Sequence, residues 1–572
     1  MPAMPLKRRP LAGPAAAVAA GCACGLSAPS LAPWFLAGTA AFVAFGLAAR
    51  RHRSARVAAT LAGAFLLAAA HAARSAGREA DRAARLDALR ESRAVATVAG
   101  TIVTEPTGFA MPQGGGRLSF RMRVQSISID EAGAHPASPA PPLPKAPFDL
   151  DIDFYGPVSL LGEAPSRPTP LAGEGWCFSG RFQSREVTYR REPLVSLRSS
   201  VRDDHRRAPE ADAPPWRQTL WSLRRETARR LTLGLDAHPD ASAVLRALLL
   251  GYRAEIPMEI RTFFANSGTV HLFAISGLHI MLVAGSLRWL LRRLGAPTRA
   301  AACALIPAVI AYTALTGGRP SAQRACLMAV LYYGAPIFRR HSDALNAVAA
   351  AAIALLATNP LQVADLGFAF SFTSVLGILL LAPPLERTLW RAIGRLRRGD
   401  GADSGEAAAE LEARMLCAQR SFEHPGWLRR TWWSVFDWFR LRGRKIVHAL
   451  AVSIAAWAVA EPITASVFGQ MVPISVVSNV LIIALGAYTV DCAAAGLLLG
   501  VFFPWLGVLA NRVSAFLVET MIFITSLFAR IPGGNFHVEP WSPALVAAWY
   551  AALCAAAMVF AGRTRASTAA RR

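Results

Sequence analysis

Long apolar segments recur along the whole chain, and they constrain its fold more than any other feature. A stretch of roughly 18 or more apolar residues is long enough to cross a bilayer as a helix. Only 17% of the residues are charged, against roughly 25% in soluble domains, because these segments exclude charge. The segments lie at about 11–28, 31–49, 57–75, 269–291, 300–316, 322–338, 344–358, 366–383, 447–467, 471–505, 509–529 and 541–562.

Basic clusters between these segments predict the orientation of the chain. Residues 7–9 and 50–56 are rich in Arg and Lys, which favour the cytoplasmic side. Three crossings before residue 78 then place the following part of the chain outside. Residues 385–446 carry 13 Arg and Lys against 8 Asp and Glu, which predicts a cytoplasmic loop. The side of the C-terminus depends on whether 471–505, long enough for two passes, crosses once or twice.

Residues 90–205 differ from the rest, because apolar and polar residues alternate there with the period of half-buried strands. One strand places Leu118, Phe120, Met122 and Val124 on a single face. The apolar residues after Val124 fall out of phase, which predicts a β-bulge near Ser126. About five such strands fit a small barrel of the OB type.

Three aspartates alternate with the apolar residues of another strand in this part of the chain. They are Asp149, Asp151 and Asp153. Carboxylates at this spacing lie on one face of a strand, where they either meet water or bind a metal ion. We favour the solvated face of a strand over a metal site.

These patterns predict an all-α polytopic membrane bundle with an inserted small all-β (OB-like) soluble domain. Residues 1–78 are assigned to three transmembrane helices, 90–205 to the OB-like domain on the outer side, and 240–562 to a second transmembrane domain. Between them, 216–235 shows helical amphipathic spacing that predicts an interfacial helix. Its apolar side holds Trp216, Leu220, Leu223 and Leu231, and arginines such as Arg224 and Arg229 lie on most of the rest.

Polar residues at the start of the segment 269–291 are candidates for function. His271, Ser276 and His279 lie there together with Gly277. Polar groups in a span tend to face the bundle interior or a wet cavity, but Ser, His and Gly also mediate close helix packing. No carboxylate is placed to orient a Ser276–His279 nucleophilic pair, and the spacing of the two histidines does not suit zinc. We therefore expect no catalytic residue and no metal site.

A glycine-rich break between two later spans holds two arginines. Gly317, Gly318, Arg319 and Arg324 belong to it. One interpretation is a turn whose arginines reach the membrane surface, and the other is an anion site lining a hydrated path. No acidic residue is close in sequence, the nearest downstream being Asp343. Asn479, a polar residue inside the segment 471–505, is a further candidate for the path.

Several of these segments occur together in one known family. The sequence HLFAISGLHI at 271–280, the TGG at 316–318 with Arg324, the Asn359-Pro360 pair with GFAFSF at 367–372, and Phe468-Gly469 with Asn479 appear in that order. The chain, over about 240–540, resembles the ComEC family of competence DNA-uptake channels. Ala484 stands where the family usually has proline, and Gly318-Arg319 replaces more apolar residues.

The resemblance implies a function and a location. It makes 240–562 a channel domain with a cytoplasmic loop at 385–446, in a multi-pass protein of the cell inner membrane that translocates single-stranded DNA during natural transformation. The OB-like domain would handle the strand, and the partners would be single-stranded DNA, the lipid bilayer, other competence proteins and a separate nuclease. Many members carry a metallo-β-lactamase-like nuclease domain, but no HxHxDH string occurs among the eleven histidines here. We therefore expect no enzyme activity and no cofactor.

Two other functions remain compatible with the sequence. The same scaffold could transport another anionic solute, or it could be a non-conducting membrane scaffold that recruits partners through 385–446. The net charge of +24 fits contact with a polyanion. From composition alone we favour the other explanation, which is the positive-inside bias together with an Arg-rich composition.

Overall fold

The computed structural model describes most of the chain. The described residues are 12–27, 53–91, 95–104, 107–110, 116–129, 148–156, 172, 174–185, 194–200, 205–208, 212–273, 277–396, 426–553 and 555–556. The predicted span at 31–49 lies outside them, as does the middle of the predicted loop 385–446. The chain forms two compact units, and each is considered by itself. One unit comprises Met1–Arg261, His271–Ala369 and Gly486–Met521, and the other comprises Thr262–Val270, Phe370–Leu485 and Ile522–Arg572.

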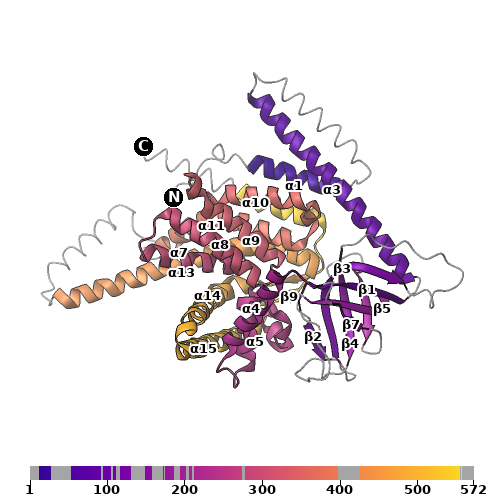
Figure 1. Cartoon of the computed structure of the whole chain (residues 1–572). Helices are drawn as coiled ribbons and strands as arrows, with labels where there is room; N and C mark the ends of the chain where they lie inside the picture. The colour runs from indigo at the N-terminus through magenta and orange to yellow at the C-terminus, as the bar shows by residue number, and fades with distance from the viewer. Residues whose placement is uncertain are drawn as a thin grey trace. The chain divides into compact units, whose positions relative to one another are not determined.

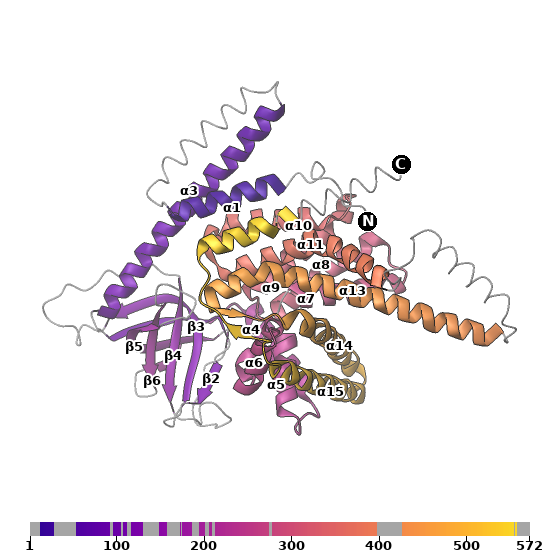
Figure 2. The ribbon, with the colours of Figure 1, turned by 180° about the vertical axis from the view of Figure 1, so that it is seen from behind.

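A closed barrel forms the β-rich part of the first unit (Figures 1 and 2). Its strands are β1 (Val95–Ile102), β3 (Gly116–Ile129), β4 (Phe148–Gly156), β5 (Gly175–Arg185) and β6 (Leu194–Ser200). The spatial order is β1-β3-β4-β6-β5, and β5 pairs back with β1 to close the barrel. β4 and β6 are parallel and the other neighbours are antiparallel, as in an OB-fold. The short strands β2 (Thr107–Ala110) and β7 (His205–Arg207) pair antiparallel with β3 and β5, respectively. The predicted OB-like domain is therefore confirmed.

Alternation along the strands fills the barrel with apolar side chains. Phe178 is fully buried, and its ring lies 5.3 Å from that of Phe120, 5.5 Å from that of Phe154 and 5.7 Å from that of Trp176. The predicted bulge is also present. Ala99 pairs with Ser126 and Gly100 with Val124, so Gln125 is the extra residue of β3.

The strands cross closely at Gly100. A Cβ added there would lie 2.1 Å from the carbonyl oxygen of Arg123. Only glycine allows β1 to approach β3 this tightly, and the bulge and the glycine together bend the sheet so that it closes.

Helices α1 (Ala12–Ser27) and α3 (Arg53–Glu91) precede the barrel and pack against each other, with Gly21 of α1 against the carbonyl oxygen of Phe65. α3 is longer than its apolar segment, because ion pairs three or four residues apart stabilise its charged second half. Near its end Leu86 packs into the barrel core. One continuous helix thus connects an apolar segment to the barrel (Figure 1).

The rest of the first unit is helical. Its helices are α4 (Pro215–Thr232), α5 (Pro239–Leu250), α7 (Gly277–Arg293), α8 (Thr298–Leu315), α9 (Pro320–Gly334) and α10 (Ala344–Thr358), with a 3-10 turn η6 (Arg253–Glu255) after α5. α7, α8 and α9 share a core that includes Ala284, Ala322, Ala325 and Ala329. Small residues at these contacts let the helices approach closely, as is typical of membrane proteins.

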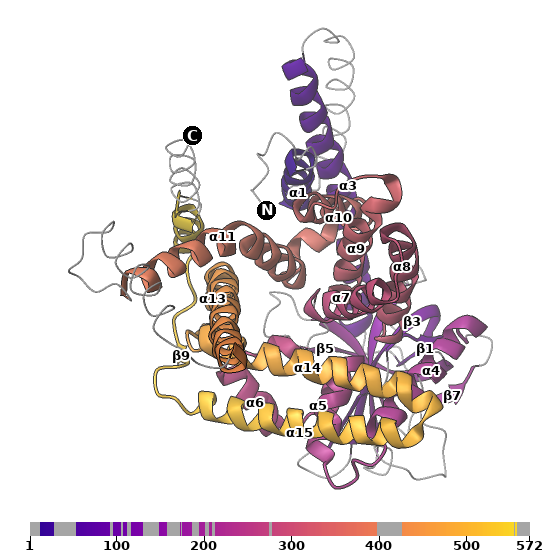
Figure 3. The same cartoon turned by 90° about the vertical axis from the view of Figure 1, so that its left-hand side faces the viewer.

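Two long helices, α14 (Ser475–Phe502) and α15 (Pro504–Ala529), lie side by side as an antiparallel pair (Figure 3). They meet at Gly500 and Gly507, where a Cβ added to either would lie 3.1 Å from the Cα of the other. The apolar segment 471–505 is therefore one helix and not two passes. Most of α14 and of α15 belongs to the first unit, whereas the second unit contains most of α6 (Met258–Asn266), most of α11 (Leu366–Leu396) and all of α13 (Gly426–Phe468).

Five helices in the described part of the chain are long and apolar enough to cross a membrane. They are Thr298–Leu315, Leu366–Ile393, Lys445–Phe468, Ser475–Phe502 and Pro504–Ala529. α7, α9 and α10 have 17, 15 and 15 residues. These lengths fall short of the ~20 residues that usually span a bilayer. Pro320 begins α9, and a 3-10 turn follows it at Ala335–Phe338, which explains the short length of that helix.

Candidate functional site

The segment that contains the candidate histidines is not one continuous helix. His271 lies exposed in a 3-10 turn at Val270–Phe273, whereas Gly277 is the first residue of α7 and His279 is buried two residues later. Ser276 lies outside the described residues. The structure thus gives the two histidines different surroundings, one open and one enclosed.

Residues just before this turn pack against the start of α14. Gly268 has φ +74°, and a Cβ there would lie 2.4 Å from the Cβ of Ser475. The hydroxyl of Ser478 donates to the carbonyl oxygen of Ser267 at 2.8 Å. Ser475 and Ser478 therefore hold this turn against α14. The sequence analysis did not single them out, although two small residues three positions apart and next to Asn479 indicate a close helix contact.

Asn479 itself carries an unsatisfied group. Its Oδ1 is buried and has no hydrogen-bond partner among the described residues. An amide oxygen that is buried in this way favours a water molecule or a polar ligand beside it.

The break between α8 and α9 lies against the C-terminal end of α5. Three successive carbonyl oxygens there accept side-chain donors: that of Leu249 from Tyr312 at 3.2 Å, that of Leu250 from Arg224 at 2.7 Å, and that of Gly251 from Arg319 at 2.6 Å. The last carbonyls of a helix have no partner inside the helix and carry its negative dipole end, so arginines stabilise them.

The two glycines of the break make this approach possible. Gly317 and Gly318 have φ +85° and +58°, which glycine adopts without strain. A Cβ at Gly317 would lie only 2.9 Å from Nη1 of Arg224. The guanidinium of Arg224 also lies over the rings of Trp221 and Tyr252, 5.1 and 4.5 Å from their centroids.

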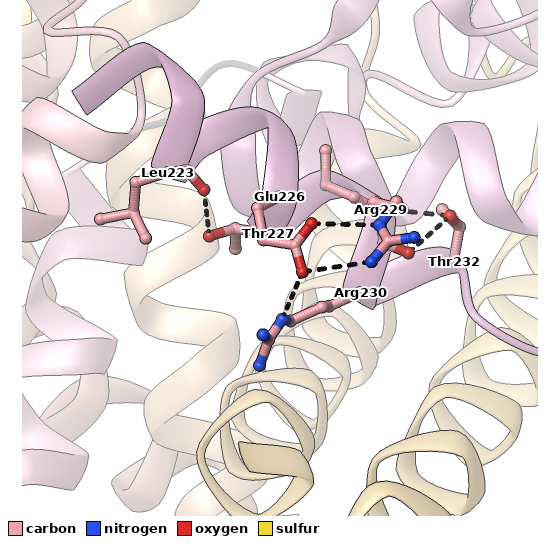
Figure 4. Close-up of polar contacts among 7 residues, drawn as sticks. Leu223, Glu226, Thr227, Arg229, Arg230 and Thr232 are labelled. Carbon is pink, nitrogen blue, oxygen red and sulfur yellow. Dashed lines mark hydrogen bonds and ion pairs between the residues drawn. The ribbon is translucent and has the colours of Figure 1, made fainter. Parts of the chain in front are cut away.

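The position of Arg224 differs from the one that the sequence predicts. Its helical spacing predicts the polar side of an interfacial helix, but its side chain is buried. The helical period alone cannot show that α5 covers this side of α4. Of the arginines of α4 that remain exposed, Arg230 and Arg229 donate to Glu226, at 2.8 and 3.0 Å (Figure 4). These hydrogen bonds, that from Arg230 first, lower the pKa of Glu226.

Arg324 has an acidic partner after all. It is 3% exposed, donates to the carbonyl oxygen of Gly367 at 2.8 Å, and lies 3.6 Å from Oδ2 of Asp365. Asp365 also accepts from the backbone N–H of Phe368 and so caps α11. The expectation that no carboxylate serves Arg324 was wrong, because the partner follows α10 and is distant in sequence. Two motifs of the family resemblance, Arg324 and the GFAFSF segment, are thereby in direct contact.

The outer surface of the barrel carries its charges in pairs on strands β3 and β4. Arg123 pairs with Asp149 and Arg121 with Asp151, each at 2.9 Å, and Arg117 lies 3.4 Å from Asp153. The hydrogen bond to Asp149 raises the pKa of Arg123.

These pairs decide the role of the three aspartates. Asp149 and Asp151 form a ladder of ion pairs with the facing strand, and Asp153, expected on the wet face, is buried. No group of three or more His, Cys, Asp or Glu side chains in the described part of the chain is arranged to hold a metal ion.

Arg181 of β5 and Arg198 of β6 are directly opposite each other, and both are exposed. Like charges in facing positions destabilise a sheet. Neither forms an ion pair with another residue of the described ranges, and the guanidinium of Arg198 lies 4.8 Å from the ring centroid of Tyr155. The side of the barrel at β5 and β6 is therefore more electropositive than the side at β3 and β4.

Comparison with known proteins agrees with the order of motifs. A family model described as "Competence protein" matches residues 248–563, which is more than half of the chain. ComE operon protein 3 of Bacillus subtilis (strain 168) is 32% identical over 158 residues, which are 28% of this chain and 20% of that protein. The uncharacterized protein YcaI of Escherichia coli (strain K12) is 41% identical over 71 residues, or 12% of this chain and 9% of that protein. The matched parts thus cover a fifth or less of either relative. Because the family model covers more than half of the chain, and the motifs that it contains form the contacts described above, this membrane protein belongs to the competence protein (ComEC) family.

Proposed function

We propose that this protein translocates single-stranded DNA across the cell inner membrane during natural transformation. The observation that carries the proposal is the match of residues 248–563 to the competence family. Apolar helices and an OB-like barrel in the same chain are what such a channel needs, because OB barrels bind single strands and the helices can enclose a path.

The barrel suggests where the strand is handled. A phosphate backbone is attracted to unneutralised Arg and Lys side chains. The β3–β4 face, which many OB barrels use, has its arginines paired with aspartates here. We therefore place the strand along β5 and β6, at Arg181 and Arg198.

A deletion of the gene in the source bacterium, with complementation, tests the proposed function. We expect transformation frequency to fall strongly and to return with the intact gene. In parallel, purified protein in planar bilayers should pass a single-stranded oligonucleotide under applied voltage. Normal transformation in the deletion strain together with no conductance would refute the proposal.

The alternatives give different results in the same experiments. A transporter for another anionic solute would conduct inorganic phosphate or a nucleotide with no competition from the oligonucleotide. A non-conducting scaffold would show neither current, yet its deletion would still reduce uptake. We further propose that degradation of the second strand belongs to a separate nuclease and that other competence proteins deliver the DNA.

A further inference from the structure

A hollow beside α3 is lined by basic side chains. Its volume is about 570 Å³, and the described residues that line it are His71, Arg74, Gly77 and Arg78. Spacings of three and four residues put the side chains of His71, Arg74 and Arg78 on one face of the helix. The hollow is far larger than the ~30 Å³ that one water molecule occupies in the liquid, so it has room for a polar ligand.

The positive charge in this hollow has no acidic partner in the described part of the chain. Arg74 and Arg78 form no hydrogen bond or ion pair with any described residue. Glu79 is the first acidic residue of the whole sequence, and it pairs with Arg82, further along the helix. The two guanidinium groups of the hollow therefore keep their donors available for an anion.

His71 adds a further donor to the hollow that it lines. Its Nε2 is buried and has no hydrogen-bond partner among the described residues. A buried polar atom without a partner costs stability, so a ligand that supplies one is favoured there. An imidazole whose proton lies on this nitrogen can donate to an oxygen of an anion.

Gly77 leaves the space between the two arginines open. A Cβ added to this residue would meet no atom within 4 Å. Glycine inside a helix lowers the stability of the helix relative to alanine. Because no close packing contact requires a glycine here, the open space beside it is what distinguishes this position.

The hollow lies where the apolar segment of α3 ends. That segment, 57–75, contains His71 and Arg74, and Arg78 follows one helical turn after Arg74. At about 1.5 Å per residue, Arg74 and Arg78 are separated by about 6 Å along the helix axis. The headgroup layer on each side of a bilayer is about 5–8 Å thick, and it holds the phosphate groups of the lipids. With the apolar segment in the bilayer, the two guanidinium groups are therefore at the depth of these phosphates.

The predicted orientation of the chain makes two arginines at this position unusual. The three predicted crossings place this end of α3 on the outer side, where the positive-inside rule predicts few arginines. A role in setting the topology therefore does not explain Arg74 and Arg78, whereas the binding of an anion does.

We propose that His71, Arg74 and Arg78 form a binding site for the headgroup phosphate of an anionic phospholipid. A guanidinium presents its N–H donors in a planar fork that matches two oxygens of a phosphate. A lipid with a net negative charge, such as phosphatidylglycerol, is preferred to a zwitterionic one, because two positive charges repel a choline group. The bound lipid anchors the depth and rotation of α3, whose far end packs into the barrel at Leu86. The inference goes beyond the proposed function and does not depend on DNA transport.

Native mass spectrometry of the full-length protein in a neutral detergent, with equal amounts of phosphatidylglycerol and phosphatidylcholine added, tests the site. The ratio of the two lipids in the first bound copy measures the preference. Arg74→Gln and Arg78→Gln should each lower this preference about fivefold, the factor that one basic residue contributes at an anionic membrane surface. Arg85→Gln is the matched control, because Arg85 lies on the same helix outside the hollow and pairs with Asp81 at 3.2 Å. It should leave the preference unchanged.

Gly77→Leu tests the space in the hollow without removing a charge. The added side chain occupies the open region between the arginines, and leucine favours a helix more than glycine does, so this variant is expected to fold. The preference for phosphatidylglycerol should again fall about fivefold. This variant also decides the question if a Gln variant does not fold.

Three results would overturn the inference. In the first, the folded variants keep the wild-type preference for phosphatidylglycerol. In the second, the Gln variants lose the preference but Gly77→Leu keeps it, which would show that charge alone attracts the lipid and that the hollow does not bind it. In the third, the variants keep the lipid preference but lose affinity for inorganic phosphate or for a single-stranded oligonucleotide, which would assign the hollow to a free anion or to DNA.

Discussion

Arg324 offers a sharp choice between a structural and a conducting role. Its guanidinium donates to the carbonyl oxygen of Gly367 and lies 3.6 Å from Asp365, whose side chain is 53% exposed. We predict that Arg324→Gln destabilises the protein by about 2 kcal/mol, because a charged hydrogen bond to a carbonyl typically contributes about 1.5–3 kcal/mol. Asp365→Asn should cost less than about 1 kcal/mol, since half-exposed ion pairs contribute little and Asn also caps a helix.

A double-mutant cycle in mixed micelles, with chemical denaturation followed by tryptophan fluorescence, measures these energies. The coupling between Arg324→Gln and Asp365→Asn should stay below about 1 kcal/mol. DNA uptake should fall in proportion to the amount of folded protein. A coupling energy above about 2 kcal/mol would contradict the small contribution that we assign to the half-exposed ion pair between Arg324 and Asp365. An Arg324→Gln protein that has wild-type stability but loses DNA uptake would show that Arg324 lines the path of the DNA.

Three further outcomes are expected. Gly100→Val should prevent the barrel from closing, because its Cβ would lie 2.1 Å from the Arg123 carbonyl oxygen, and limited proteolysis should then cleave 95–207 rapidly; persistent protease resistance would contradict this. Phe178→Ala should destabilise the barrel by about 3–5 kcal/mol, since a fully buried ring is removed, and pulse proteolysis in urea should record the loss. Purified protein should not degrade single-stranded DNA with added divalent metal, and chelator-sensitive degradation by a clean preparation would show this wrong.

Local patterns predicted the local features well. Alternation in 116–129 reports which side chains face the barrel core, so the phase change near Ser126 located the bulge to within one residue. The end of α3 is different. Its charged second half follows an apolar segment and is itself too polar to be predicted as part of a membrane span. Ion pairs along the helix and the contact of Leu86 with the barrel core stabilise it as a helix.

The sequence predicted which types of residue form the candidate site, but it did not predict which groups those residues contact. Gly317 and Gly318 were expected to break the helix, and they do so with positive φ. The acceptors of Arg224, Arg319 and Arg324 are carbonyl oxygens in other segments, which no sequence period encodes. The sequence did not reveal Asp365 as the partner of Arg324, because only acidic residues close in sequence were considered and Asp365 is close in space alone.

The net charge of +24 does not by itself show where a polyanion binds, because many of the arginines have acidic partners. On β3 the arginines are paired with aspartates of β4, and on α4 Arg229 and Arg230 share Glu226, so a polyanion could bind these arginines only by breaking their ion pairs. On β5 and β6, Arg181 and Arg198 face each other and form no ion pair with an acidic residue of the described part of the chain. A strand of DNA that is attracted by such arginines would therefore bind β5 and β6 and not the surfaces whose arginines are paired. Raising the salt concentration should accordingly weaken binding by the number of phosphates held there and not by the number of arginines on the protein.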